Sequence, residues 1–135
     1  MLRERAVSLD FSSCPASSSL ASSLESALVA AGARVEKRPE VEATDRVRAS
    51  NSRGDDLYLC FRPAKAGAIQ HYASSARGRT LAKAVAARLV PPATAVESGE
   101  YILSNTAGTA LVVSLPLEAS PDAAIGIAVG LSLGL

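Results

Sequence analysis

Aromatic side chains are scarce in this chain. Among its 135 residues there is no Trp, and there are only two Phe and three Tyr. Any core must therefore be built mainly from aliphatic side chains. Hydrophobic residues make up 48% of the sequence and charged residues 20%, a composition typical of globular rather than disordered proteins. The length predicts a single domain spanning residues 1–135, with enough residues to bury a core.

An excess of charge of one sign is also lacking. Fourteen basic residues face thirteen acidic ones, for a net charge of +1. Nucleic-acid binding needs a concentrated basic surface that neutralises phosphates, so we expect no nucleic-acid partner. The densest basic group is interpreted as the solvated face of a helix. It consists of Arg77, Arg79, Lys83 and Arg88.

Cysteine is rare, and the N-terminus lacks the apolar run of a signal peptide. Cys14 and Cys60 are too few for a disulfide framework, so two free thiols are the default interpretation. Asp10 interrupts the only apolar stretch near the N-terminus. These features favour a cytoplasmic protein by default, and the removal of a leader from a longer chain stays open as an alternative.

The C-terminal segment has no charge at all from residue 123 to 135. It is shorter than the ~20 residues that a membrane-spanning helix needs, so we expect no membrane span. Gly126, Gly130 and Gly134 recur every four residues and therefore share one side of the expected helix. Three interpretations stay open for this stripe: close packing on the protein's own sheet, a homodimer seam, or membrane contact.

Helical and strand-like patterns alternate along the chain and predict an α/β fold. Continuous apolar runs such as 57–61 and 110–115 are typical of strands buried on both faces. We therefore expect a three-layer α/β/α single domain with a mostly parallel central sheet. The predicted strands are 5–9, 33–37, 57–61, 68–73, 100–103 and 110–115. The predicted helices are 20–31, 41–51, 79–89 and one that begins at Pro121.

The stretch from Arg46 to Ala64, RVRASNSRGDDLYLCFRPA, resembles part of the zinc-dependent N-acetylmuramoyl-L-alanine amidases of the amidase type 3 group. In that family an Arg/Asn-bearing helix leads through an acid into a buried strand that ends in a zinc-binding histidine. Arg46, Asn51 and Asp56 match the arginine, the asparagine and the acid. The resemblance runs along nearly the whole chain and implies the amidase fold, which is related to phosphorylase/hydrolase-like folds.

The resemblance also shows where the chain departs from the family's zinc site. Ser13 stands where the first zinc histidine is expected, and the loop 15–19 lacks the glutamate ligand. Arg62 stands in place of the second histidine, and Ser114 in place of the catalytic glutamate. A guanidinium has only donors and cannot ligate zinc. We therefore expect no resident metal or cofactor, and a non-catalytic domain that binds a peptidoglycan fragment or a protein partner.

An active amidase with an atypical metal site is the alternative. Its ligands would have to come from Asp10, His71, Glu118 and the cysteines. His71 on its own is interpreted as a satisfied or surface histidine rather than a base.

Strand alternation places Tyr58, Cys60 and Arg62 on one face, and the resemblance makes that face the active-site side. Cys14 is expected at the same end of the sheet. A nearby cation lowers a thiol's pKa, which raises the hypothesis of a reactive thiol or a redox pair Cys14–Cys60, against the alternative of a buried core Cys60.

Arg62 needs an anionic partner. Either Glu118 or Asp10 supplies it within the chain, or a ligand does. The candidate ligand-binding residues are Arg62, Cys60, Ser13 and Ser114.

Overall fold

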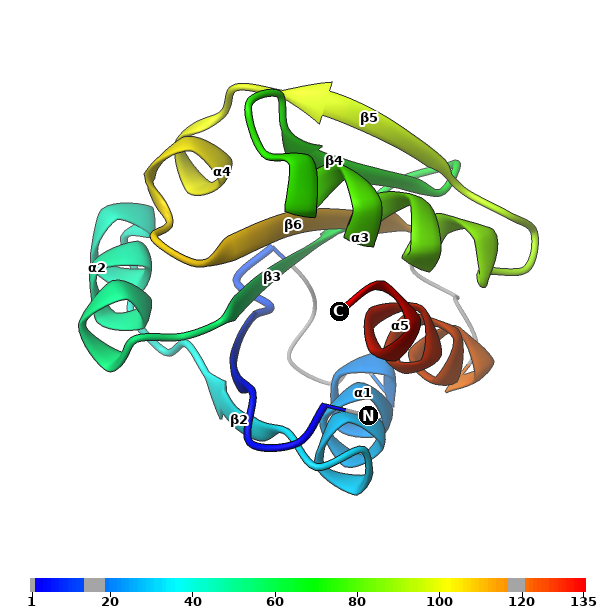
Figure 1. Cartoon of the computed structure of the whole chain (residues 1–135), viewed down its shortest axis with the longest axis horizontal. Coiled ribbons are helices and arrows are strands. Elements are labelled where there is room, and N and C mark those ends of the chain that lie inside the picture. The colour runs from blue at the N-terminus through cyan, green and yellow to red at the C-terminus, as the bar shows by residue number, and fades with distance from the viewer. Residues whose placement is uncertain (1, 14–18, 117–120) are drawn as a thin grey trace.

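A computed structural model describes residues 2–13, 19–116 and 121–135 of the chain. The expected alternation of strands and helices is present (Figure 1). The strands are β1 (Ala6–Asp10), β2 (Arg34–Lys37), β3 (Leu57–Pro63), β4 (Ala68–Tyr72), β5 (Thr94–Ser98) and β6 (Thr109–Leu115). The helices are α1 (Ser19–Ala30), α2 (Ala43–Arg53), α3 (Ala76–Ala87), α4 (Tyr101–Asn105) and α5 (Pro121–Gly134).

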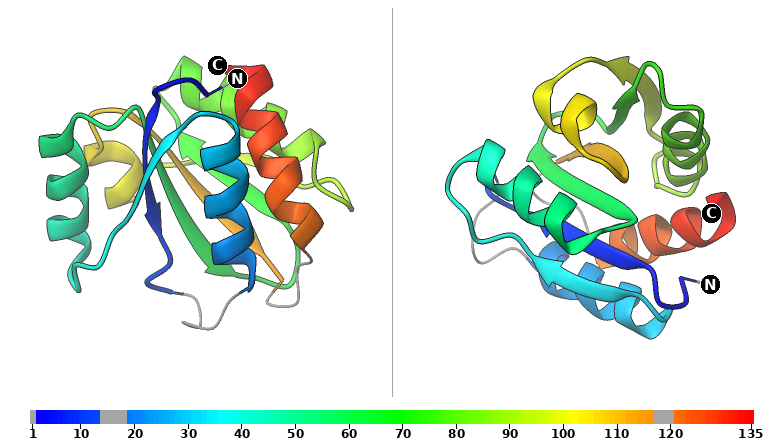
Figure 2. Two further views of the ribbon diagram at one scale, coloured as in Figure 1. Left: turned by 90° about the horizontal axis from the view of Figure 1, so that it is seen from below. Right: turned by 60° about the vertical axis from the view of Figure 1, so that its left-hand side comes forward.

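The strands form one sheet in the order β2-β1-β3-β6-β4-β5. All neighbouring strands are parallel except β4 and β6, which are antiparallel. Helices α1, α3 and α5 cover one face, and α2 and α4 lie on the other (Figures 1 and 2). The three-layer α/β fold with a mostly parallel sheet is therefore confirmed.

One sequence-based assignment is wrong. Residues 100–103 were expected to form a strand, but Tyr101–Asn105 is a short helix and the strand lies before it at Thr94–Ser98. Ile102 and Leu103, the apolar pair of that short helix, are buried. An apolar run this short is compatible with either a helix or a strand, which is why the sequence pattern misled. β5 sits at the sheet edge and is mostly exposed, and it therefore lacks the apolar pattern that marks the inner strands.

The two faces of the sheet have different chemistry. Beneath α1, α3 and α5 the core is aliphatic, and it includes Leu57, Leu59 and Phe61. The ring of Phe11 stacks on that of Phe61 with centroids 4.7 Å apart. Beneath α2 and α4 a smaller core contains Tyr58 and Cys60, so the predicted alternation along β3 is confirmed.

Helix α2 is polar, and its contact with the sheet is largely ionic. Arg46, Val47 and Ser50 are its buried residues. The Ser50 hydroxyl donates to Asp55 Oδ2 at 2.8 Å, and Ser8 donates to the same oxygen. The helix ends at Gly54, whose φ of 74° is the left-handed conformation that favours glycine.

Candidate functional site

The carboxyl ends of β1, β3 and β6 bring together most of the residues that the sequence singles out. In register, Asp10 pairs with Cys60, and Arg62 pairs with Ser114. Paired residues on parallel neighbours project to the same side of the sheet, so all four side chains share the α2/α4 face. Ser13 is exposed in the turn after β1. Cys14 and Glu118 lie outside the described residues.

Asp10 is the centre of a buried hydrogen-bond network. Its Oδ2 accepts from Arg46 Nε at 2.9 Å and from the Tyr58 hydroxyl at 2.6 Å. Its Oδ1 accepts from the hydroxyl and the backbone N–H of Ser12, at 2.6 and 3.0 Å. Both oxygens are therefore fully used by the chain itself.

The network sets the ionisation of its members. Burial alone would raise the pKa of Asp10, but the hydrogen bonds from Ser12 and Tyr58 and the charge of Arg46 hold it below its usual value. Burial and the hydrogen bond to Asp10 raise the pKa of Tyr58. The site thus holds an ionised carboxylate, a neutral phenol and a guanidinium at neutral pH.

Arg46 also ties α2 to the loop before it. Its Nη1 donates to the carbonyl of Val41 at 2.6 Å and to that of Glu40 at 3.1 Å. The arginine therefore positions the start of α2 over the end of β1. The sequence resemblance matches Arg46 to the family's helix arginine. In the structure the Arg46 side chain holds α2 in place through these hydrogen bonds.

Arg62 is ion-paired with Glu100, a partner that the sequence did not indicate. Its two terminal nitrogens donate to the two carboxylate oxygens of Glu100, Nη1 across 2.9 Å to Oε2. The bond to Glu100 raises the pKa of Arg62. Asp10 is already occupied by Arg46, whereas Glu100 is brought beside β3 by the unexpected strand–helix segment β5–α4. The pair is partly open to solvent, with 35% of the Arg62 side chain and 27% of the Glu100 side chain exposed.

The surroundings of Cys60 favour the interpretation of a buried core cysteine over that of an activated thiol. Cys60 is a free, buried cysteine. Burial first, and then the negative charge of Asp10, raise its pKa to about 12, and the nearby Arg62 only partly offsets this. A thiolate is therefore disfavoured at neutral pH. The proposed pairing with Cys14 concerns a residue outside the described part of the chain.

His71 lies on the other face of the sheet. It pairs in register with Leu111, a member of the aliphatic core, and its Nδ1 lies 3.2 Å from the carbonyl oxygen of Tyr72. Asp10 and His71 thus lie on opposite faces of the sheet and are not placed to bind one metal ion together. Cys14 and Glu118, the other ligands named for such a site, lie outside the described residues. Across residues 2–13, 19–116 and 121–135, no group of three or more His, Cys, Asp or Glu is placed to hold a metal ion.

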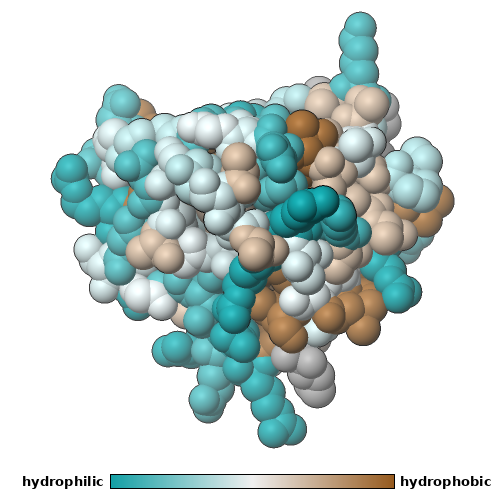
Figure 3. Space-filling view, turned by 45° about the horizontal axis from the view of Figure 1, so that its top comes forward, coloured by the Kyte–Doolittle hydropathy of each residue, from teal (hydrophilic) through white to brown (hydrophobic). Residues whose placement is uncertain are grey.

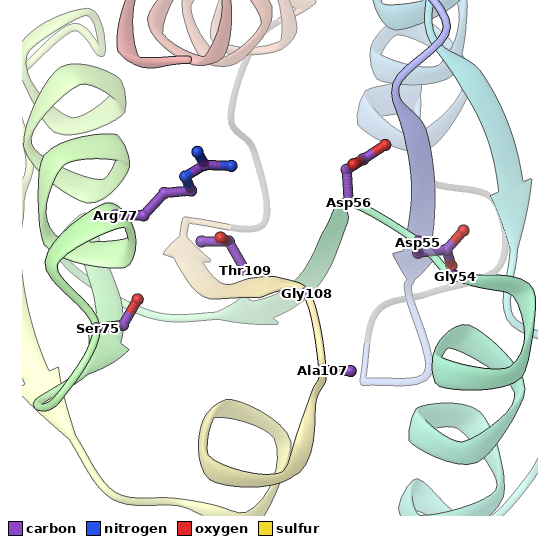
Figure 4. A pocket seen from close by; sticks show the side chains of 8 residues that line it. All are labelled: Gly54, Asp55, Asp56, Ser75, Arg77, Ala107, Gly108 and Thr109. Atoms are coloured by element: carbon purple, nitrogen blue, oxygen red, sulfur yellow. The ribbon is translucent and has the colours of Figure 1, made fainter.

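A cavity of about 450 Å³ opens at the amino end of β3 and β6 (Figure 4). Arg77 and Ser75 line one wall, and Asp55 and Asp56 lie on the far side with their side chains directed away from Arg77. Asp56 accepts from the N–H of Ala6 at 2.9 Å, and Asp55 is bonded within the sheet. Both acids are thus engaged within the chain, and Arg77 is an exposed cation in the lining of this cavity.

Several solved structures have the same fold as this chain. The CwlV catalytic domain, an N-acetylmuramoyl-L-alanine amidase from Bacillus(Paenibacillus) polymyxa var. colistinus, superposes with a TM-score of 0.70 at 12% identity, over 96% of this chain and 95% of that one. The chain has the fold of amidase catalytic domains. The CwlD amidase from Clostridioides difficile, in complex with the GerS lipoprotein, gives 0.72 at 7% identity, over 97% and 98% of the two chains. An amidase from Clostridium difficile 630 gives 0.67 at 12%, over 98% and 95%.

At these identities the likeness is one of fold. No family model matches the chain. No curated protein sequence matches it either.

The glycine stripe of α5 is internal. A Cβ on Gly130 would lie 2.6 Å from Val85 Cα, and one on Gly126 would lie 2.6 Å from the Arg88 carbonyl oxygen. The stripe, including Gly134, packs against α3 of the same chain, rather than directly on the sheet. The close packing expected of these glycines is thus made within the chain, which disfavours a homodimer seam through them. No helix in the described part of the chain is long and apolar enough to cross a membrane.

Proposed function

We propose that this chain is a non-catalytic amidase-like domain that binds an acidic group at Arg62. The group belongs to a peptidoglycan fragment or to a protein partner. The observation that carries the proposal is the two-pronged Arg62–Glu100 ion pair at the end of β3, where the family resemblance calls for a zinc ligand.

The chemistry of this position supports binding rather than hydrolysis. A guanidinium cannot ligate zinc, but it matches a carboxylate with two parallel hydrogen bonds. Ser114, beside Arg62 in the sheet, offers a hydroxyl where a general base would be needed. A hydroxyl of ordinary pKa cannot accept a proton from water near neutral pH.

The Glu100 carboxylate occupies the position on Arg62 that a ligand carboxylate would take, and a ligand can displace it. Because the ion pair is partly exposed, its net contribution to stability is at most about 1 kcal/mol, and an incoming carboxylate can replace it at little cost. Tyr101, the next residue, lines a groove of about 450 Å³ between α2 and α4.

The fold is compatible with a protein partner as well. CwlD has been solved in complex with the GerS lipoprotein. For this chain we propose that either kind of partner presents a carboxylate to Arg62, because a guanidinium pairs with a carboxylate through two parallel hydrogen bonds.

The test combines binding and metal analysis. Muropeptides with a free carboxylate are titrated into the purified protein by calorimetry, and the zinc content is measured. We expect binding that is lost in Arg62→Gln and kept in Arg77→Gln, which removes an exposed arginine at the opposite end of the sheet. We also expect no stoichiometric zinc and no amide hydrolysis.

Two outcomes contradict the proposal. Tightly bound stoichiometric zinc with chelator-sensitive amidase activity would show that the domain is an enzyme. Muropeptide binding that is unchanged by Arg62→Gln would place the ligand elsewhere.

A further inference from the structure

Helix α5 exposes a row of large apolar side chains. Ile125, Val129 and Leu133 are 58%, 40% and 62% exposed, and their spacing of four residues puts them on one side of the helix. In Figure 3 the hydrophobic residues on the surface lie in small groups among hydrophilic ones. A contiguous row of exposed apolar side chains on a helix is a candidate interaction site.

The glycine stripe prevents the helix from turning this row inward. Gly126 and Gly130 lie against the backbone of α3 so closely that no side chain fits there. Ile127 and Leu131 are fully buried in the aliphatic core. With these two sides of α5 fixed, the row of Ile125, Val129 and Leu133 must face outward.

The neighbouring helix α1 adds a complementary hollow. A depression of about 480 Å³ lies on its outward side, and Val29 at its edge is 54% exposed. Its one charged lining residue, Glu25, is neutralised by Lys37 across 2.9 Å. We call the outward sides of the two helices together the α1/α5 face. The hollow is lined by Ser22, Glu25, Ser26, Val29 and Ala30.

We propose that a second copy of this chain covers the α1/α5 face. Helices α1 and α5 lie side by side (Figure 2). A two-fold rotation about an axis perpendicular to this face lays the apolar row of each copy over the hollow of the other, so each copy supplies both halves of the contact. The two helices carry one charged residue each, Glu25, which is paired with Lys37, and Asp122 in the first turn of α5, so little charge repulsion opposes self-pairing.

The charge pattern argues against a lipid surface as the occupant. Amphipathic helices that bind anionic membranes carry lysine or arginine beside the apolar side. Neither SLASSLESALVA of α1 nor PDAAIGIAVGLSLG of α5 contains a basic residue.

The size of the face sets the strength of the contact. Helices of 12 and 14 residues are roughly 18–21 Å long, and neighbouring helices lie about 10 Å apart, so the face covers on the order of 400 Å². Stable complexes bury about 800 Å² per partner. The dimer is therefore weak, and its population depends on concentration.

Sedimentation equilibrium of the full chain tests this proposal. We expect the mean mass to rise from the monomer value of 13.8 kDa toward twice that value between about 10 μM and 1 mM protein. The double variant Ile125→Asp/Leu133→Asp should stay at the monomer mass at every concentration. Val41→Asp, which changes an 89% exposed valine before α2, should associate like the wild type.

Circular dichroism and thermal melting of each variant establish that it is folded. Should the double aspartate variant fail to fold, Ile125→Ser/Leu133→Ser replaces it with the same expectation. A wild-type chain that stays monomeric to 1 mM overturns the proposal. So does association that the double variants retain, or a monomer that co-floats with phosphatidylcholine vesicles.

Discussion

Arg46 Nε donates to Asp10 Oδ2 across 2.9 Å in a setting where Asp10 is fully buried and the arginine side chain is only 8% exposed. Removing one member of a buried pair leaves the other charge without compensation. We predict that Asp10→Asn lowers the free energy of unfolding by about 3–5 kcal/mol, measured by urea denaturation at pH 7. The variant Asp45→Asn, which changes an exposed acid on α2, serves as the control and should stay within about 0.5 kcal/mol of the wild type.

The same pair predicts an acid dependence of stability. The folded-state pKa of Asp10 is lowered, so the unfolded chain binds the proton more readily than the folded chain does. The ionised Asp10 carboxylate makes its full contribution to the free energy of unfolding above the unfolded-state pKa of about 3.9. That contribution is lost as the pH falls through the lower pKa of the folded state. The stability difference between wild type and Asp10→Asn should therefore narrow below about pH 4. A difference that stays constant from pH 7 to pH 3 would contradict this assignment.

The Arg62–Glu100 pair should behave differently from the Asp10–Arg46 pair. Because both side chains are partly exposed, Glu100→Gln is expected to change the unfolding free energy by less than about 1 kcal/mol. The same change frees the guanidinium for a ligand, so muropeptide affinity should increase. Calorimetric titration measures this effect, and a weaker affinity in Glu100→Gln would mean that Glu100 itself contacts the ligand.

The Cys60 thiol should not react with thiol reagents in the folded protein. It is buried and has a pKa of about 12, so very little thiolate exists at pH 8. In Cys14→Ser, where Cys60 is the remaining cysteine, labelling with a chromogenic disulfide reagent should occur only at the rate of unfolding. Labelling of the native protein as fast as that of the urea-unfolded chain would restore the hypothesis of a reactive thiol.

Replacing a glycine of the α5 stripe by a larger residue should destabilise the fold, because these glycines pack closely within the chain. Gly130→Ala places a Cβ 2.6 Å from Val85 Cα, where only backbone movement can relieve the clash, and we expect a loss of about 1–3 kcal/mol. Gly99→Ala meets no atom within 4 Å and should be close to neutral. Thermal melting compares the two variants, and equal melting temperatures would contradict the packing of α5 on α3.

Much of the site was predictable because it depends on local periodicity. The alternation in residues 57–62 assigns Tyr58, Cys60 and Arg62 to one side of β3 whatever surrounds them, and the register of β3 with β1 and β6 adds Asp10 and Ser114. The need of Arg62 for an anion followed from its charge. The identity of that anion did not, because Glu100 is 38 residues away and reaches Arg62 through a strand and a helix that the apolar pattern does not mark.

The amino-acid sequence by itself determined an aliphatic α/β domain, the order of its inner strands along the chain and a cation at the end of β3. These features depend on side-chain period and charge, which are properties of neighbouring residues. Only the tertiary structure decided that the glycines of α5 face α3 and that Cys60 is buried beside Asp10. It also decided that His71 lies across the sheet from Asp10. Each of these depends on which distant segment packs against a residue, and therefore on the desolvation and charge that the packed segment brings.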